Sequence, residues 1–510
     1  MTLFNRKTAT PHRGFITVSV MLATIMQALD TTIANVALPH MQGSLGATQD
    51  QISWVLTSYI VAAAIMTPPT GFFENRFGRK RLFLVAIGGF TIASMLCGAA
   101  TSLEEIVLFR MLQGVFGASL VPLSQTVLLD AYPHEQHGQA MAVWGMGIMV
   151  GPILGPTLGG YLTEYYSWRW VFYINLPVGI MAFLGVMAFV AETPKRKVTF
   201  DVLGFSFLSL GLGALQMFLD RGQLKDWFGS NEIIIELALG IFGMYAFVVH
   251  MFTTDKPFLS PAIFKDRNFV TGLLFIFIVG IILLATLALL PPFLQDLMGY
   301  PVLTTGYVLA PRGVGTLIAM TIVGRVITRL DPRLLILAGF LLAAYSLYQM
   351  SGFTTEVSEW ALIWSGFIQG LGLGFIFVPL TTIAFTTLDP KLRTEAAGLY
   401  SLVRNIGSSI GISVVTMLLA RFTQENHMNL AAHATPLNPA FRSPNYPEIW
   451  NLATTAGRAA LDAEINIQAT TIAYLNDFKL MMYVMLAAVP MLIIMRRPRR
   501  KAPLEQMVME

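Results

Sequence analysis

Fourteen long apolar stretches limit, more than any other feature, what this chain can fold into. Each is about 20 residues long, enough at ~1.5 Å per residue for a helix to cross a ~30 Å hydrocarbon layer. Because a backbone in lipid must satisfy its own hydrogen bonds, we expect every stretch to be a helix. The sequence therefore predicts an all-α membrane protein. The stretches lie near 15–38, 51–73, 82–101, 104–128, 138–162, 168–190, 201–219, 232–252, 268–293, 303–328, 333–350, 358–386, 396–420 and 478–496.

Composition supports a membrane protein and argues against several functions. Of the 510 residues, 55% are hydrophobic and only 12% are charged, about half the charged fraction of a soluble domain. The single cysteine, Cys97, rules out an internal disulfide, and the histidines form no ligand-spaced cluster. We find no Walker-type loop and no nucleophile–base–acid set. We expect no metal, no nucleotide cofactor and no enzymatic activity.

The basic residues predict an orientation in the membrane. The clusters at 76–81, 195–197 and 496–501 all fall on one side if the chain crosses the membrane fourteen times. Because Lys and Arg are enriched in cytoplasmic loops, both termini are expected in the cytoplasm. The basic residues sit in short loops beside apolar spans, so they do not indicate a nucleic-acid partner. We expect the first span to be retained, since no small-residue cleavage site follows it.

One predicted loop, 421–477, is much longer than the others and would lie outside the membrane. It contains a Pro/Asn-rich part over 436–447 and a helix-prone stretch over 454–475. Loops of this length are usually functional or disordered. We favour a structured periplasmic hairpin or lid over disorder.

Short motifs recur in the same order in the two ends of the chain. Gln113-Gly114 recurs as Gln369-Gly370, and Val121-Pro122-Leu123 recurs as Val378-Pro379-Leu380 at nearly the same offset. The small residues 140, 151 and 155 recur at 396, 407 and 411. This repeat predicts two six-helix halves, 1–190 and 268–510, with two further helices inserted over 191–267. Paired halves that enclose a midplane site are the architecture of alternating-access transporters.

Asp30 is the main candidate for a functional residue. It lies in the first span, about 8 residues or ~12 Å from the outer end, where an unpaired carboxylate costs several kcal/mol. Arg110, in the fourth span, lies at a similar depth, so an ion pair is possible. A proton arriving at Asp30 would break the pair and let Arg110 reorganise partners such as Gln27 and Gln113. The alternative is a permanent ion pair that only joins two helices.

Glycines at every fourth position mark the fifth span. Gly147, Gly151, Gly155 and Gly159 share one helix face, which lets a neighbouring helix approach closely. Pro152 and Pro156 are expected to bend the helix. We predict a gating hinge at the interface between the halves, with plain close packing as the alternative.

Several of these motifs resemble the major facilitator superfamily, and within it the fourteen-span drug:proton antiporters of the EmrB/QacA type. The resemblance covers about 15–500. It rests on the first-span sequence LDTTIANVALP at 29–39, a motif B at 109–117, and Trp168 to Pro177. Residues 147–160 resemble motif C of the antiporters, which importers are expected to lack. The resemblance implies the fold of that superfamily and export driven by the proton gradient.

The segment 71–81 resembles motif A of the same superfamily, in which an arginine and an acidic residue latch the cytoplasmic side. At the positions of motif A, this chain has Gly71, Asn75, Arg76, Gly78 and Arg79. The family usually has Asp where this chain has Asn75. An amide can cap a facing helix but carries no charge. A charged latch and a merely topogenic basic loop both remain open.

The predicted substrate cavity combines cations with aromatic residues. Three arginines lie inside predicted spans, whereas Asp30 is the one acidic residue that is clearly buried there. The membrane interior is therefore cationic on balance. If Arg312 faces the cavity, amphipathic weak acids or neutral aromatic compounds suit it better than organic cations; pairing with backbone carbonyls is the alternative. The aromatic residues would supply stacking walls, or else pack against lipid or neighbouring helices. The cavity candidates are Gln27, Trp54, Tyr59, Gln113, Trp144, Arg312 and Arg404.

These features predict proton-coupled multidrug efflux of hydrophobic small molecules across a bacterial inner membrane. The resemblance also implies a periplasmic membrane-fusion protein and an outer-membrane channel as partners, with 421–477 as the docking surface. One alternative is a dedicated exporter of a single metabolite, such as a siderophore or a fatty-acid-like compound. Another is a membrane sensor or scaffold that transports nothing.

Overall fold

The structure is a computed structural model that describes residues 12–133, 136–195, 199–255, 257, 259–327, 329–389, 392–435, 438–439 and 447–495. Within these residues, 13 helices are each long and apolar enough to cross a membrane. A further span is formed by two shorter helices, Trp54–Met66 and Thr70–Phe77, bent by 59° at their junction. The count reaches 14 with this bent pair, which confirms the predicted all-helical membrane fold.

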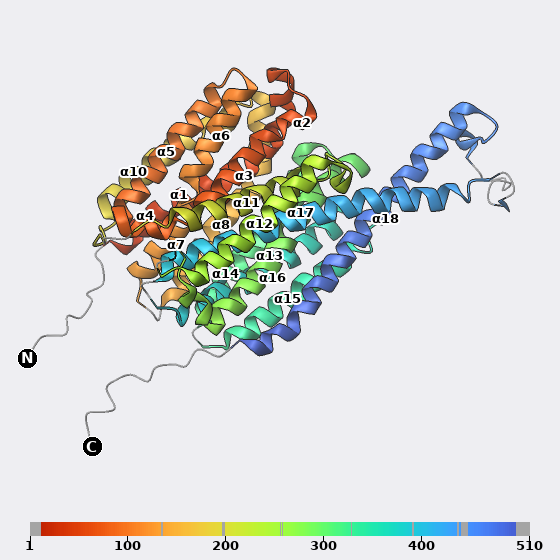
Figure 1. Cartoon of the computed structure of the whole chain (residues 1–510). Helices are drawn as coiled ribbons and strands as arrows, with labels where there is room; N and C mark the ends of the chain where they lie inside the picture. Colours follow the sequence, from red (N-terminus) through yellow and green to blue (C-terminus); the bar gives the residue numbers. More distant parts are fainter. Residues whose placement is uncertain are drawn as a thin grey trace, which may run out of the picture.

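The first six spans form one bundle (Figure 1). Its bend between α3 and α4 coincides with Pro68-Pro69, where two backbone N–H groups are missing. The helices are α1 (Arg13–Leu45), α2 (Gln49–Ile52), α3 (Trp54–Met66), α4 (Thr70–Phe77), α5 (Arg79–Ala99), α6 (Leu103–Gly117), α7 (Leu120–Ala131), α8 (His137–Tyr165), α9 (Trp170–Tyr173) and α10 (Asn175–Phe189).

The last six spans form the second bundle. Side-chain caps set several of its helix starts: Asp266 accepts a hydrogen bond from Phe269 N, and Ser358 from Ala361 N. Its elements are α13 (Arg267–Pro292), the π-helix η4 (Phe293–Leu297), α14 (Val302–Val326), α15 (Pro332–Met350), α16 (Glu359–Thr386), α17 (Arg393–Ala431), η7 (Glu448–Trp450), α18 (Thr455–Ala488) and η8 (Val489–Ile494).

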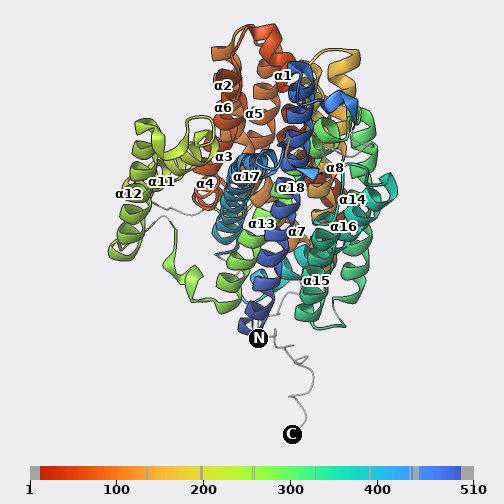
Figure 2. The same ribbon diagram turned by 90° about the vertical axis from the view of Figure 1, so that its right-hand side faces the viewer.

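The inserted segment places one helix against both bundles. It consists of α11 (Val202–Arg221), η2 (Trp227–Gly229), α12 (Asn231–Thr253) and η3 (Pro261–Lys265). On one side, the Thr57 hydroxyl on α3 donates to the Asp220 carboxylate. On the other side, Gln216 Nε2 donates to Ser409 Oγ on α17 at 2.8 Å, and Ser413 Oγ donates to the Leu219 carbonyl at 2.6 Å. The outer helix α12 packs on α11 and lies at the edge of the molecule (Figure 2).

Helices extend deep into the predicted long loop. α17 continues to Ala431 and α18 already begins at Thr455, so the predicted helical stretch over 454–475 is the first part of α18. His427 and Asp462 join the two helices at 2.9 Å. The pair projects well beyond the rest of the molecule (Figure 1). Most of the Pro/Asn-rich part, namely residues 436, 437 and 440–446, lies outside the described residues.

Candidate functional site: a buried ion pair beside a central cavity

Asp30 and Arg110 form a buried ion pair inside the first bundle. Their side chains are 0% and 1% exposed, and Arg110 Nη1 lies 2.6 Å from Asp30 Oδ2. Gln113 lies one helical turn after Arg110 on α6, so both reach the same place. Gln113 Nε2 donates to Asp30 Oδ1 at 2.8 Å, and its Oε1 accepts from Arg110 Nη1 at 2.7 Å. Arg110 Nε donates to the Val55 carbonyl at 3.1 Å. Hydrogen bonding of this kind is what makes buried charges tolerable.

Asn175 is a member of this network that the sequence did not single out. At the start of α10, its Nδ2 donates to Asp30 Oδ1 at 2.9 Å and also contacts Ser94 Oγ at 3.0 Å. The residue belongs to the family-like stretch Trp168 to Pro177, but that motif does not indicate what the amide contacts. The signal available was a lone polar side chain in an apolar span, which in a membrane usually has a specific partner.

A cavity of about 1070 Å³ lies between the two bundles and touches the ion pair through Arg110. Tyr59 lines the cavity and places its ring 4.3 Å from the Arg110 guanidinium carbon. Gln27, also in the cavity wall, donates from Nε2 to the Tyr59 hydroxyl at 3.2 Å. Asp30 is not part of the wall. Protonation of Asp30 from the cavity therefore requires that Arg110 or Tyr59 move.

The wall contains four of the predicted cavity residues, and three others lie elsewhere. Gln27, Tyr59, Arg312 and Arg404 line the cavity. Gln113 does not, because both ends of its amide serve the Asp30–Arg110 pair.

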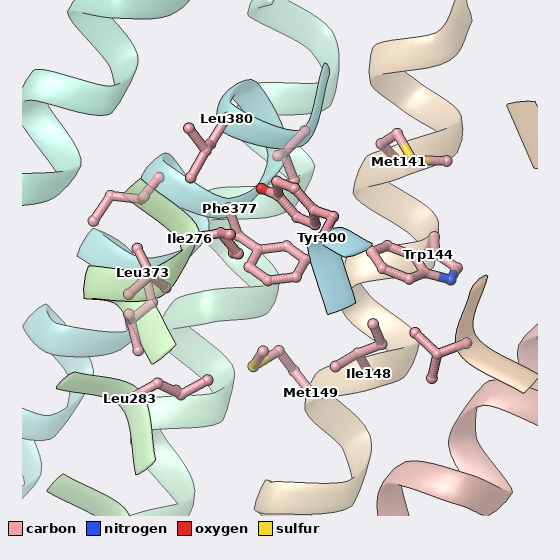
Figure 3. Close-up of a cluster of buried hydrophobic side chains, with 14 of the residues drawn as sticks. Met141, Trp144, Ile148, Met149, Ile276, Leu283, Leu373, Phe377, Leu380 and Tyr400 are labelled. Atoms are coloured by element: carbon pink, nitrogen blue, oxygen red, sulfur yellow. The ribbon is translucent and has the colours of Figure 1, made fainter. Parts of the chain in front are cut away.

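The two tryptophans predicted to line the cavity also lie elsewhere. Trp54 packs against the Arg221 guanidinium at 4.9 Å, in a separate pocket beside α11. Trp144 donates from Nε1 to Ser124 Oγ at 2.8 Å and is fully buried. Its ring stacks on Phe377 of the other bundle at 6.0 Å, within an apolar cluster that includes Tyr400 and Met149 (Figure 3). Trp144 thus packs beneath the cavity wall, of which Phe377 is a part.

The glycine face of α8 packs on α1, within the first bundle. A Cβ at Gly147 would overlap Met21, one at Gly151 the Ala28 carbonyl, one at Gly155 the Thr32 hydroxyl, and one at Gly159 would crowd Ile33. Thr32 Oγ1 donates to the Gly151 carbonyl at 2.9 Å across this contact. The prediction that these glycines lie at the interface between the halves is wrong.

Other residues of α8 contact the second bundle. Gly138 faces Ile327, Gly145 faces Met320, and Thr157 faces Gly306 on α14. At 3.6 residues per turn, these residues lie on a different face of α8 from the four glycines. The helix therefore presents one face to α1 and another to α14. Pro152 lies in the α8 backbone, but its side chain is outside the described residues. A hinge in α8 stays a prediction.

The residues of motif A form a charged contact in which Glu74 supplies the acid. Arg79 Nε lies 2.6 Å from Glu74 Oε1, and Arg79 Nη1 lies 2.6 Å from Asp130 Oδ2 on α7. Asn75 Nδ2 donates at 2.9 Å to the Gly71 carbonyl of its own helix, so it does not cap a facing helix. Gly78 has φ +92°, a backbone conformation that suits glycine.

The same end of the molecule joins the two bundles. A Cβ at Gly71 would lie 2.7 Å from Glu395 Cγ on α17, so α4 and α17 approach closely. Arg393 Nη1 lies 3.7 Å from Asp130 Oδ1, and Glu395 accepts from Ser260 N at 3.4 Å. Arg76 is exposed and forms no ion pair with any described residue. The charged residues of motif A therefore lie where the halves are in contact.

Two six-helix bundles around a central cavity, with a buried titratable pair at its wall, define a secondary transporter. The model of the Major Facilitator Superfamily matches residues 20–412. The chain belongs to this superfamily, as a multi-pass inner-membrane protein. It is 37% identical to the multidrug export protein EmrB of Escherichia coli K12 over 448 residues, 87% of each chain. It is 38% identical to the fatty acid resistance protein FarB of Neisseria gonorrhoeae, covering 83% of this chain and 84% of that protein.

A solved structure agrees with the fold. The human organic anion transporter MFSD10 (TETRAN) superposes with a TM-score of 0.59 at 14% sequence identity, covering 93% of this chain and 100% of that one. At this identity the likeness concerns the fold alone.

Proposed function

We propose that the protein exports hydrophobic and amphipathic small molecules in exchange for protons, as an EmrB-like multidrug transporter. The observation that carries the proposal is the buried Asp30–Arg110 pair, whose arginine is part of the wall of the central cavity. The similarity to EmrB supports the same reading. The proton gradient is the only energy source required, and no cofactor takes part.

The geometry suggests how a proton couples to the cavity. Protonation of Asp30 would cancel its charge and leave Arg110 buried without a counter-ion, which is costly in a low-dielectric interior. Arg110 would then turn to other acceptors, and the Gln27 and Tyr59 side chains that contact this region would rearrange with it. Because these residues line the cavity, a proton and a substrate compete for the same local arrangement. This competition is the condition for exchange transport.

We further propose, from the enrichment of Lys and Arg in loops on one side, that both termini lie in the cytoplasm and the projecting part of α17 and α18 in the periplasm. This projection is a suitable docking surface for a periplasmic membrane-fusion protein, which would connect the permease to an outer-membrane channel. Replacement of 428–461 by a short linker is expected to abolish capture of such an adaptor. Proton-driven transport in proteoliposomes should persist in the same variant. Retained adaptor capture would contradict the docking role.

The decisive experiment is transport by everted vesicles with an imposed pH gradient, comparing wild type with Asp30→Asn. Gradient-dependent uptake of several unrelated amphipathic compounds by wild type, lost in the variant, is the expected result. Uptake confined to one compound would favour a dedicated exporter, for which the similarity to a protein named for fatty acid resistance is the supporting observation. A phenotype unchanged in Asp30→Asn would favour a sensor or scaffold.

A further inference from the structure

The second bundle contains a modified copy of the Asp30 site. The sequence offset that relates the two halves places Thr286 at the position of Asp30, and Gln369 at the position of Gln113. The contact is kept: Gln369 Nε2 donates to Thr286 Oγ1 at 3.3 Å, as Gln113 Nε2 donates to Asp30. The copy has therefore lost its carboxylate but not its amide.

The cation of the copy comes from a different helix. The position equivalent to Arg110 is Gly366 on α16, which has no side chain. The nearest side-chain atom to a Cβ built at Gly366 is Arg312 Cβ on α14, at 3.8 Å. A Cβ at Gly370 would overlap the Arg312 carbonyl, so two glycines of α16 leave room for this arginine. The second bundle thus has an arginine next to the position where the first bundle has Arg110.

Arg312 is buried, charged and incompletely bonded. It is 7% exposed, and its Nη2 donates to the Leu283 carbonyl at a long 3.3 Å. Its Nη1 has no hydrogen-bond partner among the described residues. Gln369 Oε1 is likewise buried and without a partner there. A buried charged donor left unbonded costs more than a neutral one, and arginine does not lose its proton in proteins.

Arg312 also lines the central cavity, together with the apolar side chains of Leu283, Leu287 and Phe377. Two carboxylates, Glu164 and Asp296, belong to the same wall, but neither forms an ion pair with Arg312. The cavity wall therefore combines a buried, incompletely bonded arginine with an apolar surface, in a volume of about 1070 Å³ that accommodates a drug-sized molecule. The unbonded Nη1 is itself enclosed by protein, so the guanidinium must turn to meet a ligand in the cavity.

We propose that Arg312 binds a carboxylate of the transported molecule, which takes the place of the missing counterpart of Asp30. The ligand class is an amphipathic monocarboxylate, with its charged end at Arg312 and its apolar part along the leucines. This inference rests on the proposed export function and assigns the residue that selects among its substrates. Arginine is suited to this role because its planar donors match a carboxylate.

The test compares three probes that carry an alkyl chain of the same length: decanoate, decanamide and decyltrimethylammonium. Proton-driven transport by reconstituted wild type and Arg312→Gln is measured over a range of probe concentrations. The variant should lose decanoate transport by about tenfold or more, mainly through KM, with decanamide changed less than about twofold. Arg312→Lys, which keeps the charge, should retain part of the decanoate transport. Arg421→Gln, an exposed arginine of α17 outside the cavity, is the matched control.

Two results would overturn the inference. One is an equal loss for all three probes, which would indicate a structural role for Arg312. The other is full decanoate transport by Arg312→Gln. If wild type transports none of the probes, the proposed function fails. Binding of the probes is then measured on its own, by thermal unfolding in detergent. Decanoate should then raise the Tm of wild type but not of Arg312→Gln, and an equal rise in both would dismiss the site.

Discussion

Asn175 donates its amide to Asp30 Oδ1, the same carboxylate oxygen that Gln113 contacts, from a helix at the other side of the pair. Asp30 is therefore held by α6 and α10 together, with every oxygen bonded. A change at this carboxylate therefore reaches three side chains, Arg110, Gln113 and Asn175, at once.

The ion pair predicts a difference between single and double variants. Asp30→Asn leaves the Arg110 charge buried without its counter-ion, which should destabilise the protein by about 3–5 kcal/mol. In Asp30→Asn/Arg110→Gln no charge remains, so most of this stability should return. Transport should stay absent in both. Thermal unfolding and proton-driven uptake, measured on the same preparations, check the two parts. Restored transport in the double variant would show that the pair only joins two helices.

Removal of the Asn175 amide should change the pH dependence of transport. In Asn175→Ala the carboxylate loses one donor while its partner Arg110 remains, so the Asp30 side chain is held less firmly in the network. The profile of transport rate against pH should then differ from that of wild type. Ser94→Ala is the control, because Ser94 contacts Asn175 but not Asp30. Profiles of initial rate against pH distinguish the variants, and coincident profiles would exclude a role for Asn175 in proton binding.

The glycine face of α8 should be intolerant of any side chain. In Gly151→Ala the new methyl group overlaps the Ala28 carbonyl, which belongs to the backbone and cannot rotate away. The helices must separate, at a cost of about 1–3 kcal/mol. Gly43→Ala, in α1 with open space around it, should leave stability unchanged or raise it slightly. A comparison of unfolding temperatures tests this, and equal temperatures would refute close packing as the function of the glycines.

Glu74 should stabilise the contact between the halves more than the residues around it do. Glu74→Gln removes the charge paired with Arg79, in a position where only 8% of the Glu74 side chain is exposed. The contact should weaken, and a cysteine placed at buried Thr394 should react faster with a soluble thiol reagent. Arg76→Ala should have no such effect, since Arg76 is exposed. Equal reactivity in both variants would mean that Glu74 does not control access.

The span count and the partnership of Asp30 with Arg110 could be predicted from the sequence, because apolar length and the cost of buried charge are local properties. The side of a helix that a residue faces was harder to predict. Trp144 and Trp54 are aromatic, as residues that line cavities often are, but their positions depend on how the bundles pack. Both lie outside the cavity. The glycines of α8 were recognised as a packing face, but the sequence could not indicate whether α1 or α14 would fill it.

The helix α11 has a consequence for the route of the substrate. By bonding to α3 through Asp220 and to α17 through Gln216, it covers the seam between the bundles on that side, and Gln216 itself belongs to the cavity wall. A lipid-dissolved molecule cannot pass there from the acyl chains without breaking these polar bonds. The insertion thus shields one flank of the central cavity from the bilayer.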